Sequence, residues 1–298
     1  MRITPLIASR FRSDGGAMFG LVPKPIWSRH LPPDELNRIP QHAHALLLEL
    51  DDGQTGLVDS GCGDPSLLSD KEREQQALGS DWPLMDALQA RGLAPAQIDF
   101  VILTHLHWDH AGGAVRPGPD QPGPRFPNAR YYLHEQEWAD AVSGDPLLYK
   151  SYPPDIVAAL QALPVTQRCL VSDAQPDLFP GVRLERSGGH TRGHSVIHLE
   201  SGDLELNHPD AAAFGPVRHA LFAGDVCPTH AHLRLVFQTA YDTFPLDTRR
   251  WKQTWLPRIA AEPIALFFDH DPDLFAAFIA PDPRAEYVLR DTLPCPHS

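Results

Sequence analysis

The chain has few cysteines and no long apolar run. Its 298 residues include 4 Cys, and none of them forms a Cys-x-x-Cys pair. This spacing is typical of reduced thiols in a cytosol, although spacing alone leaves a disulfide open. No apolar run is long enough to span a bilayer, and the first ten residues lack the apolar centre of a signal peptide. We therefore expect a cytoplasmic protein with no membrane partner.

Positive charge is also scarce. The chain has 25 Lys and Arg against 38 Asp and Glu, which gives a formal net charge of −13. Such a chain is repelled by nucleic acid and anionic membranes at long range, so we expect no nucleic-acid partner. A hydrophobic fraction of 42% is enough for a substantial core, and 31 Pro scattered among apolar runs predict long, stiffened loops rather than disorder.

The most informative stretch is Thr104–Gly113, which reads THLHWDHAGG. It follows the short apolar run Phe100–Leu103, which predicts a buried strand. Three imidazoles and a carboxylate are thus gathered in the turn beyond a strand end, where an open α/β sheet usually places its chemistry. The alternative is a loop that is rich in histidine by chance, since the chain has 16 of them.

The spacing of these side chains indicates metal binding. His105 and His107 are two apart on extended backbone, so they point to the same side and can share one ion. Asp109 and His110 follow where the chain must bend, and could face a second ion. Imidazole nitrogen and carboxylate oxygen suit zinc, iron or manganese.

Four further stretches occur in the order known from one protein family. They are Leu57–Gly61, Gly189–His194, Phe222–Asp225 and Phe268–Asp271. With the opening motif they make the sequence resemble the metallo-β-lactamase superfamily, and within it the branch of lactonases and organophosphate hydrolases. The resemblance spans roughly residues 44–271. The acidic balance argues against the nuclease branch.

The resemblance implies an α/β fold, the αβ/βα four-layer sandwich of two mixed sheets with helices outside. We expect a single metallo-β-lactamase-like domain over residues 1–298, with an N-terminal loop over residues 1–43. Residues 143–169, rich in Pro, are expected to form an insertion over the site.

The resemblance also implies two divalent metal ions, zinc in the first place and iron or manganese as alternatives. Its ligands would be His105, His107 and His190 for one ion, Asp109, His110 and His270 for the other, and Asp225 shared by both. Asp109 is expected to act catalytically as well, taking a proton from the attacking oxygen. Asp59 would orient a metal-binding imidazole, and His194 would lie behind the ligands rather than among them.

Candidates for the substrate pocket are less sharply defined. Met18 and Phe19 stand at the tip of a glycine-hinged loop that could fold over the pocket, or anchor the segment to the core. His44 belongs to a second His-x-His and could line the pocket or a polar strand edge. The lactonases carry a substrate-binding Tyr shortly after the shared Asp, where this chain has none; Thr229, His232 or Tyr241 could replace it.

The implied activity is hydrolysis of small esters, lactones or organophosphates by a dinuclear metal enzyme, in which a hydroxide bridging the ions attacks the substrate. One alternative is a glutathione thioester hydrolase like glyoxalase II. Another is an iron-dependent oxygenase like the persulfide dioxygenases. A third is a sensor that keeps the fold without the chemistry, but no expected ligand is missing. The partner is a small molecule, and the oligomeric state stays open, a homodimer included.

Overall fold

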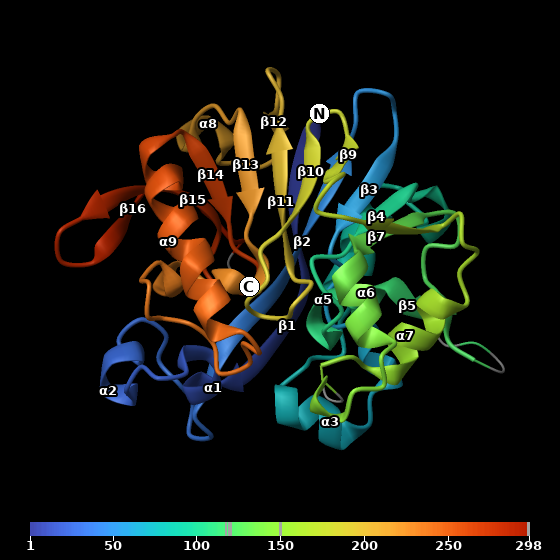
Figure 1. The fold of residues 1–298 in the computed structure, drawn as a ribbon, viewed down its shortest axis with the longest axis horizontal. Coiled ribbons are helices and arrows are strands. Elements are labelled where there is room, and N and C mark those ends of the chain that lie inside the picture. The colour runs from blue at the N-terminus through green and yellow to red at the C-terminus, as the bar shows by residue number, and fades with distance from the viewer. Residues whose placement is uncertain (117, 119–120, 149–150, 297–298) are drawn as a thin grey trace.

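Two seven-stranded sheets face each other across an apolar core in the computed structural model, which describes residues 1–116, 118, 121–148 and 151–296. Helices cover the outer face of each sheet (Figure 1). Leu46 and Val58 of the first sheet pack in one cluster with Ile197, Phe222 and Phe267 of the second. The predicted αβ/βα sandwich is confirmed. None of the helices in the described ranges is long and apolar enough to cross a membrane.

The first sheet combines antiparallel and parallel strands. Its spatial order is β12 (Glu205–Leu206), β1 (Arg2–Asp14), β2 (Arg38–Glu49), β3 (Thr55–Val58), β4 (Phe100–Ile102), β7 (Arg130–His134) and β8 (Arg168–Val171). β3, β4, β7 and β8 run parallel to one another. Their carboxyl ends therefore meet at one edge of the sheet, which is where β4 leads into the histidine motif.

The second sheet is mostly antiparallel. Its order is β16 (Glu286–Pro294), β15 (Leu274–Asp282), β14 (Ile264–Phe267), β13 (His219–Phe222), β11 (Ser195–Glu200), β10 (Val182–Arg186) and β9 (Asp177–Phe179). β13 and β14 are its parallel pair, so the residues that follow both strands lie side by side. A separate ribbon joins β5 (Val115–Arg116) to β6 (Gly123–Pro124).

The helices are short except for the last. They are α1 (Gly15–Phe19), α2 (Lys24–Trp27), α3 (Asp70–Gln76), α4 (Pro83–Ala90), α5 (Trp108–Ala111), α6 (Glu135–Ala141), α7 (Pro154–Gln161), α8 (Ala211–Phe214) and α9 (Pro245–Ala261). α4, α6 and α7 pack on the first sheet. α9 presents Trp251, Trp255 and Ile259, one helical stripe, to the second sheet.

The expected N-terminal loop over residues 1–43 is wrong. Arg2–Asp14 form β1, paired antiparallel with β2, and β2 itself begins at Arg38. Most of β1 is buried on both faces. A strand of this kind lacks the alternation of apolar and polar residues by which a half-buried strand is recognised. Polar residues such as Thr4 and Ser9 also interrupt its apolar run.

The expected insertion at residues 143–169 is shorter than predicted. Its last two residues, Arg168 and Cys169, begin β8 at the edge of the first sheet. Residues 149 and 150 lie outside the described ranges. The remainder contains α7, whose Ile156 and Leu160 pack against the first sheet. The segment is therefore anchored to the core and is not only a cover of the site.

Gly56 offers a test of how tightly the first sheet is packed. It is the register partner of Phe100, and a Cβ at Gly56 would lie 2.3 Å from that aromatic ring. Gly56→Ala should lower the free energy of unfolding by about 1–3 kcal/mol because the buried ring has to move. Gly123→Ala is the control, because a Cβ there meets no atom within 4 Å. Equal urea midpoints for the two variants would contradict this packing.

Candidate metal centre

The histidine motif is placed by the end of β4. Leu103 still pairs with Tyr132 of β7, and the chain then turns into α5, which carries Asp109 and His110. Three segments of the second sheet approach this turn: the β10–β11 loop, the turn after β13 and the turn after β14. They bring His190, Asp225 and His270. All predicted ligands therefore meet between the two sheets.

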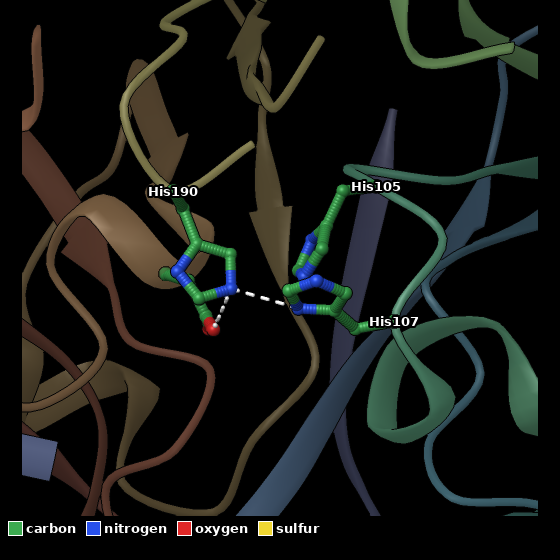
Figure 2. A group of neighbouring side chains, drawn as sticks. His105, His107 and His190 are labelled. Carbon is green, nitrogen blue, oxygen red and sulfur yellow. Dashed lines mark hydrogen bonds and ion pairs between the residues drawn. The ribbon is translucent and has the colours of Figure 1, made fainter. Parts of the chain in front are cut away.

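The first group of ligand atoms consists of His105, His107, His190 and Asp225, which lie within 4.8 Å of one another. His190 Nε2 is 2.8 Å from His107 Nδ1 and 2.8 Å from Asp225 Oδ2. Figure 2 shows the rings of His105 and His107 pointing toward His190, which approaches from the opposite side. Both sheets thus contribute to this group.

The second group contains His110, Asp225, Asp269 and His270, again within 4.8 Å of one another. The Nε2 atoms of His110 and His270 are 3.2 Å apart. Asp225 Oδ1 is 3.1 Å from His270 Nε2 and 3.4 Å from His110 Nε2. Asp109 Oδ2 lies 3.5 Å from His270 Nε2, so Asp109 borders this group. Asp225 faces both groups with different oxygens.

These distances fit metal ligation. Two nitrogens bound at 2.0–2.1 Å to one tetrahedral or octahedral ion lie about 2.9–3.4 Å apart, which matches the separations of the imidazole nitrogens. Several buried atoms also have no hydrogen-bond partner within the described chain: His105 Nε2, Asp225 Oδ1 and both carboxylate oxygens of Asp269. Buried polar atoms are normally satisfied, so unpartnered atoms that converge indicate an ion. The donor set of nitrogen and oxygen suits zinc, iron or manganese.

The charges of the site agree with this interpretation. Burial, and then the neighbouring imidazole of His110, lower the pKa of His105 well below its usual range, which leaves the ring neutral with a lone pair to donate. Burial raises the pKa of the Asp269 carboxyl well above its usual range. Burial would raise the pKa of Asp225 as well, but His190, His270 and His110 outweigh it and hold that pKa well below its usual range. A cation would satisfy these groups together.

Asp59 supports the motif as expected. It follows β3 with a left-handed φ of 54°. Its Oδ2 accepts a hydrogen bond of 2.9 Å from His110 Nδ1, and its two oxygens accept from the backbone N and the hydroxyl of Thr104. The carboxylate therefore fixes the ring of His110 so that Nε2 faces the second group, as outer carboxylates do for metal-binding histidines.

His194 lies behind the ligands. Its Nε2 accepts a hydrogen bond of 3.0 Å from the backbone N of Asp225, and its Nδ1 donates to Ser187 Oγ at 2.6 Å. Both ring nitrogens are thus engaged, and His190 rather than His194 stands in the first group. His194 acts on the site by holding the backbone of Asp225.

Sequence reasoning missed the partner of His190. Asp242 Oδ1 accepts a hydrogen bond of 3.0 Å from His190 Nδ1, and Asp242 is itself held by Thr239 and Thr248. Its position 52 residues after His190, in a loop before α9, gave no signal in the sequence. Spacing cannot reveal such a partner, because only the folded loop brings it close.

Glu137 was also missed. It is fully buried in α6 and accepts hydrogen bonds from the backbone N of Leu106 and from Thr191 Oγ1. It therefore ties the turn of the histidine motif to the loop of His190. Burial raises its pKa to about 7. This role could not be inferred from the sequence, because Glu137 lies in a pattern that is typical of a surface helix.

A cavity of about 300 Å³ opens onto both groups. Its lining consists of Ser13, Met18, Gln41, Gln76, His107, Trp108, Asp109, Ser151, His190, Asp225, Tyr241 and His270. Met18 reaches it from α1, which is one of the two placements that the sequence left open, and Ser151 reaches it from the expected insertion. Several candidate ligands thus form part of the cavity wall, together with other polar and apolar side chains.

Four other pocket candidates lie behind this wall. Phe19 stacks between Trp27 and His232, which makes it an anchor of α1 in the core. His232 is fully buried; it donates from Nε2 to Met18 O, and its Nδ1 accepts from Thr229 Oγ1. His44 is buried against Phe268 O. The pocket role of Phe19, His44, Thr229 and His232 is therefore wrong, because their polar atoms or rings are used within the core.

Comparison with known proteins supports the resemblance predicted from the motifs. The sequence profile of the metallo-β-lactamase superfamily matches residues 38–116, which include the histidine motif. The solved structure of a probable metal-dependent hydrolase from Staphylococcus aureus superposes with a TM-score of 0.76 at 28% identity, covering 98% of this chain and 97% of the other. The chain thus resembles the metallo-β-lactamase superfamily both in this segment and in its fold. The resemblance predicted from the motifs is confirmed.

Curated relatives within the metallo-β-lactamase superfamily are lactonases. An N-acyl homoserine lactonase of a Bacillus species is 25% identical over 178 residues, which are 57% of this chain and 62% of that protein. The N-acyl homoserine lactonase AiiB of Agrobacterium fabrum is 33% identical over 159 residues, 44% of this chain and 52% of AiiB. The chain thus matches less than two thirds of the length of these relatives.

The link from Asp242 to His190 can be tested by metal affinity. Asp242→Asn removes the charge that orients His190 while keeping the side-chain volume. Loss of such an outer partner usually weakens metal binding roughly 10–100-fold. Competition with a chromophoric chelator measures the change. Asp247→Asn is the control, because Asp247 pairs only with exposed Arg250 among the described residues. Equal affinities would contradict the role of Asp242.

Proposed function

We propose that this protein is a hydrolase of small cyclic or aryl esters, lactones above all, that works with two divalent metal ions. The observation that carries the proposal is the pair of ligand groups that share Asp225. One ion would be held by His105, His107 and His190, the other by Asp109, His110 and His270. Zinc is the expected ion, since the donors are imidazole and carboxylate.

Two bound ions would supply an activated water at neutral pH and polarise the carbonyl oxygen of the substrate. The chain's own groups then have separate tasks. Asp225 offers one oxygen to each group. Asp109 borders the second group at the wall of the cavity, where it can accept a proton from the attacking water. His190 and His110 are kept in register by Asp242 and Asp59.

Asp269 adds an oxygen donor that was not expected. Its Oδ2 lies 3.8 Å from His270 Nε2 and 3.9 Å from His110 Nε2, and the side chain is 1% exposed. We include Asp269 in the second group, either as a further ligand or as a carboxylate that lies beside a ligand. An additional oxygen donor favours harder ions such as manganese at that position relative to zinc.

The size and lining of the cavity support a small substrate. A volume of about 300 Å³ is at the lower end for small-molecule sites and suits a lactone ring with a short substituent. Met18 and Trp108 offer apolar surface, and Gln41, Ser13 and Tyr241 offer hydrogen bonds. The lactonase relatives point to the same substrate class. A thioester of glutathione would have to extend beyond this cavity.

The two ligand groups also bear on the oxygenase alternative. A dioxygenase with one iron needs only the first group, whereas here the second group is equally converged. Turnover under strictly anaerobic conditions would separate the two reactions, because hydrolysis consumes no oxygen.

Removing a ligand should abolish metal binding and hydrolysis together. His107→Ala and Asp225→Ala are each expected to lower the bound metal, measured by elemental analysis. They should lower lactone turnover by more than the roughly 100-fold that loss of an outer partner costs. His208→Ala, outside both groups, is the control. Full metal content and full turnover in Asp225→Ala would contradict the proposal.

Tyr241 is our candidate for the residue that contacts the substrate in place of the missing lactonase Tyr. It lines the cavity and is 48% exposed. Tyr241→Phe should lower kcat/KM for lactones about 2–10-fold, the value of one hydrogen bond, with metal content unchanged. Tyr287→Phe, on β16 and outside the cavity lining, is the control. An unchanged kcat/KM for every lactone tested would exclude a role for the hydroxyl.

A further inference from the structure

A second cluster of metal-binding side chains lies outside the candidate centre. His42 and His44 are neighbours on one face of β2, and Cys295 follows the end of β16. One ring nitrogen of each histidine and the Cys295 sulfur lie within 4.8 Å of one another. Residues about 250 positions apart are thus brought together by the fold.

His44 is oriented as metal-binding histidines are. Its Nδ1 donates a hydrogen bond of 2.8 Å to Phe268 O, and the side chain is 2% exposed. The donation at Nδ1 leaves the lone pair on Nε2, which faces Cys295 Sγ at 3.4 Å. A backbone carbonyl that fixes the tautomer in this way is a usual outer partner of a ligating imidazole.

The packing of this cluster leaves a polar atom without a partner. His42 Nδ1 is buried and makes no hydrogen bond within the described chain. A thiol packed as a small group against His44 Nε2 would explain the burial of Cys295, which is 3% exposed, but not the unpartnered Nδ1 of His42. An ion bound by His42 Nδ1 together with His44 and the sulfur would satisfy this nitrogen.

The surrounding charges favour a cation. The buried carboxylate of Asp271 acts on His42, His44 and Cys295, and Asp273 also acts on Cys295. Two groups oppose this charge: Arg10, which faces His42 and Cys295 but is paired with Asp81 at 3.6 Å, and His230, whose Nδ1 lies 2.6 Å from Asp271 Oδ2. The carbonyl of Asp271, 3.9 Å from Cys295 Sγ, is a further oxygen donor beside the cluster.

We propose that His42, His44 and Cys295 form a third metal site that binds a single zinc ion. Two imidazoles and a thiolate are a borderline-soft donor set that suits zinc better than magnesium, calcium or manganese. The ion would fasten the residues after β16 to β2. It would also support the candidate centre, because His42 O accepts the hydrogen bond from His270 Nδ1 at 2.9 Å.

The test uses Co²⁺ as a spectroscopic substitute for zinc in the full chain. The first and second ligand groups of the candidate centre contain no sulfur. Cobalt bound there therefore gives no thiolate-to-metal charge-transfer band in the near ultraviolet. Titration of the metal-stripped protein with Co²⁺ should produce this near-ultraviolet band, with a final amplitude that corresponds to one thiolate-bound ion per chain. Cys295→Ser should remove it, and His42→Gln should weaken or remove it. No band at saturating Co²⁺ would overturn the proposal.

Two other cysteines serve as controls. Burial, and after it the nearby carboxylate of Asp109, raise the pKa of the Cys62 thiol. Because Cys62 lies this close to Asp109, its thiol is the alternative source of a sulfur signal. Cys62→Ser and Cys169→Ser should both keep the band. A band that survives in Cys295→Ser and vanishes in Cys62→Ser would place the sulfur ligand at the dinuclear centre and refute the third site. Zinc analysis should show one ion fewer in Cys295→Ser.

Discussion

The carboxylate of Asp225 is the point on which the site depends. It lies between two groups of buried imidazoles and presents a different oxygen to each. Buried charges and unpartnered polar atoms are costly, and His105, Asp225 and Asp269 all have such atoms within the described chain. Divalent ions held by these residues would satisfy all of these atoms and would offset the cost of so many buried ionisable groups.

The geometry of the centre is set by both sheets. Asp59, at the end of β3, fixes His110, whereas Asp242, before α9, fixes His190. His270 is held by the carbonyl of His42 on β2. Each outer partner thus comes from an element other than that of its ligand. The apolar core between the sheets therefore determines the distances between ligands as much as the loops that carry them.

The residues themselves predicted the local part of the site, whereas the distant ligands His190, Asp225 and His270 were predicted only through the family resemblance. The histidine motif was foreseen because its residues lie within one turn after a strand. Asp242 and Glu137 were not, because each acts on a loop that is distant in the sequence. β1 was missed for another reason: a strand buried on both faces shows no alternation of polar and apolar residues.

Four of the six pocket candidates do not line the cavity, whereas Met18 and Tyr241 do. His232 lies behind α1, where it holds Met18 O and stacks on Phe19, and Thr229 is bonded to His232. A residue that is close in sequence to a site residue can be expected to lie near the site. Whether its side chain faces the cavity or the core depends on which groups its polar atoms bind in the fold. Since Thr229 already satisfies the second nitrogen of His232, that ring had no atom left to offer a substrate.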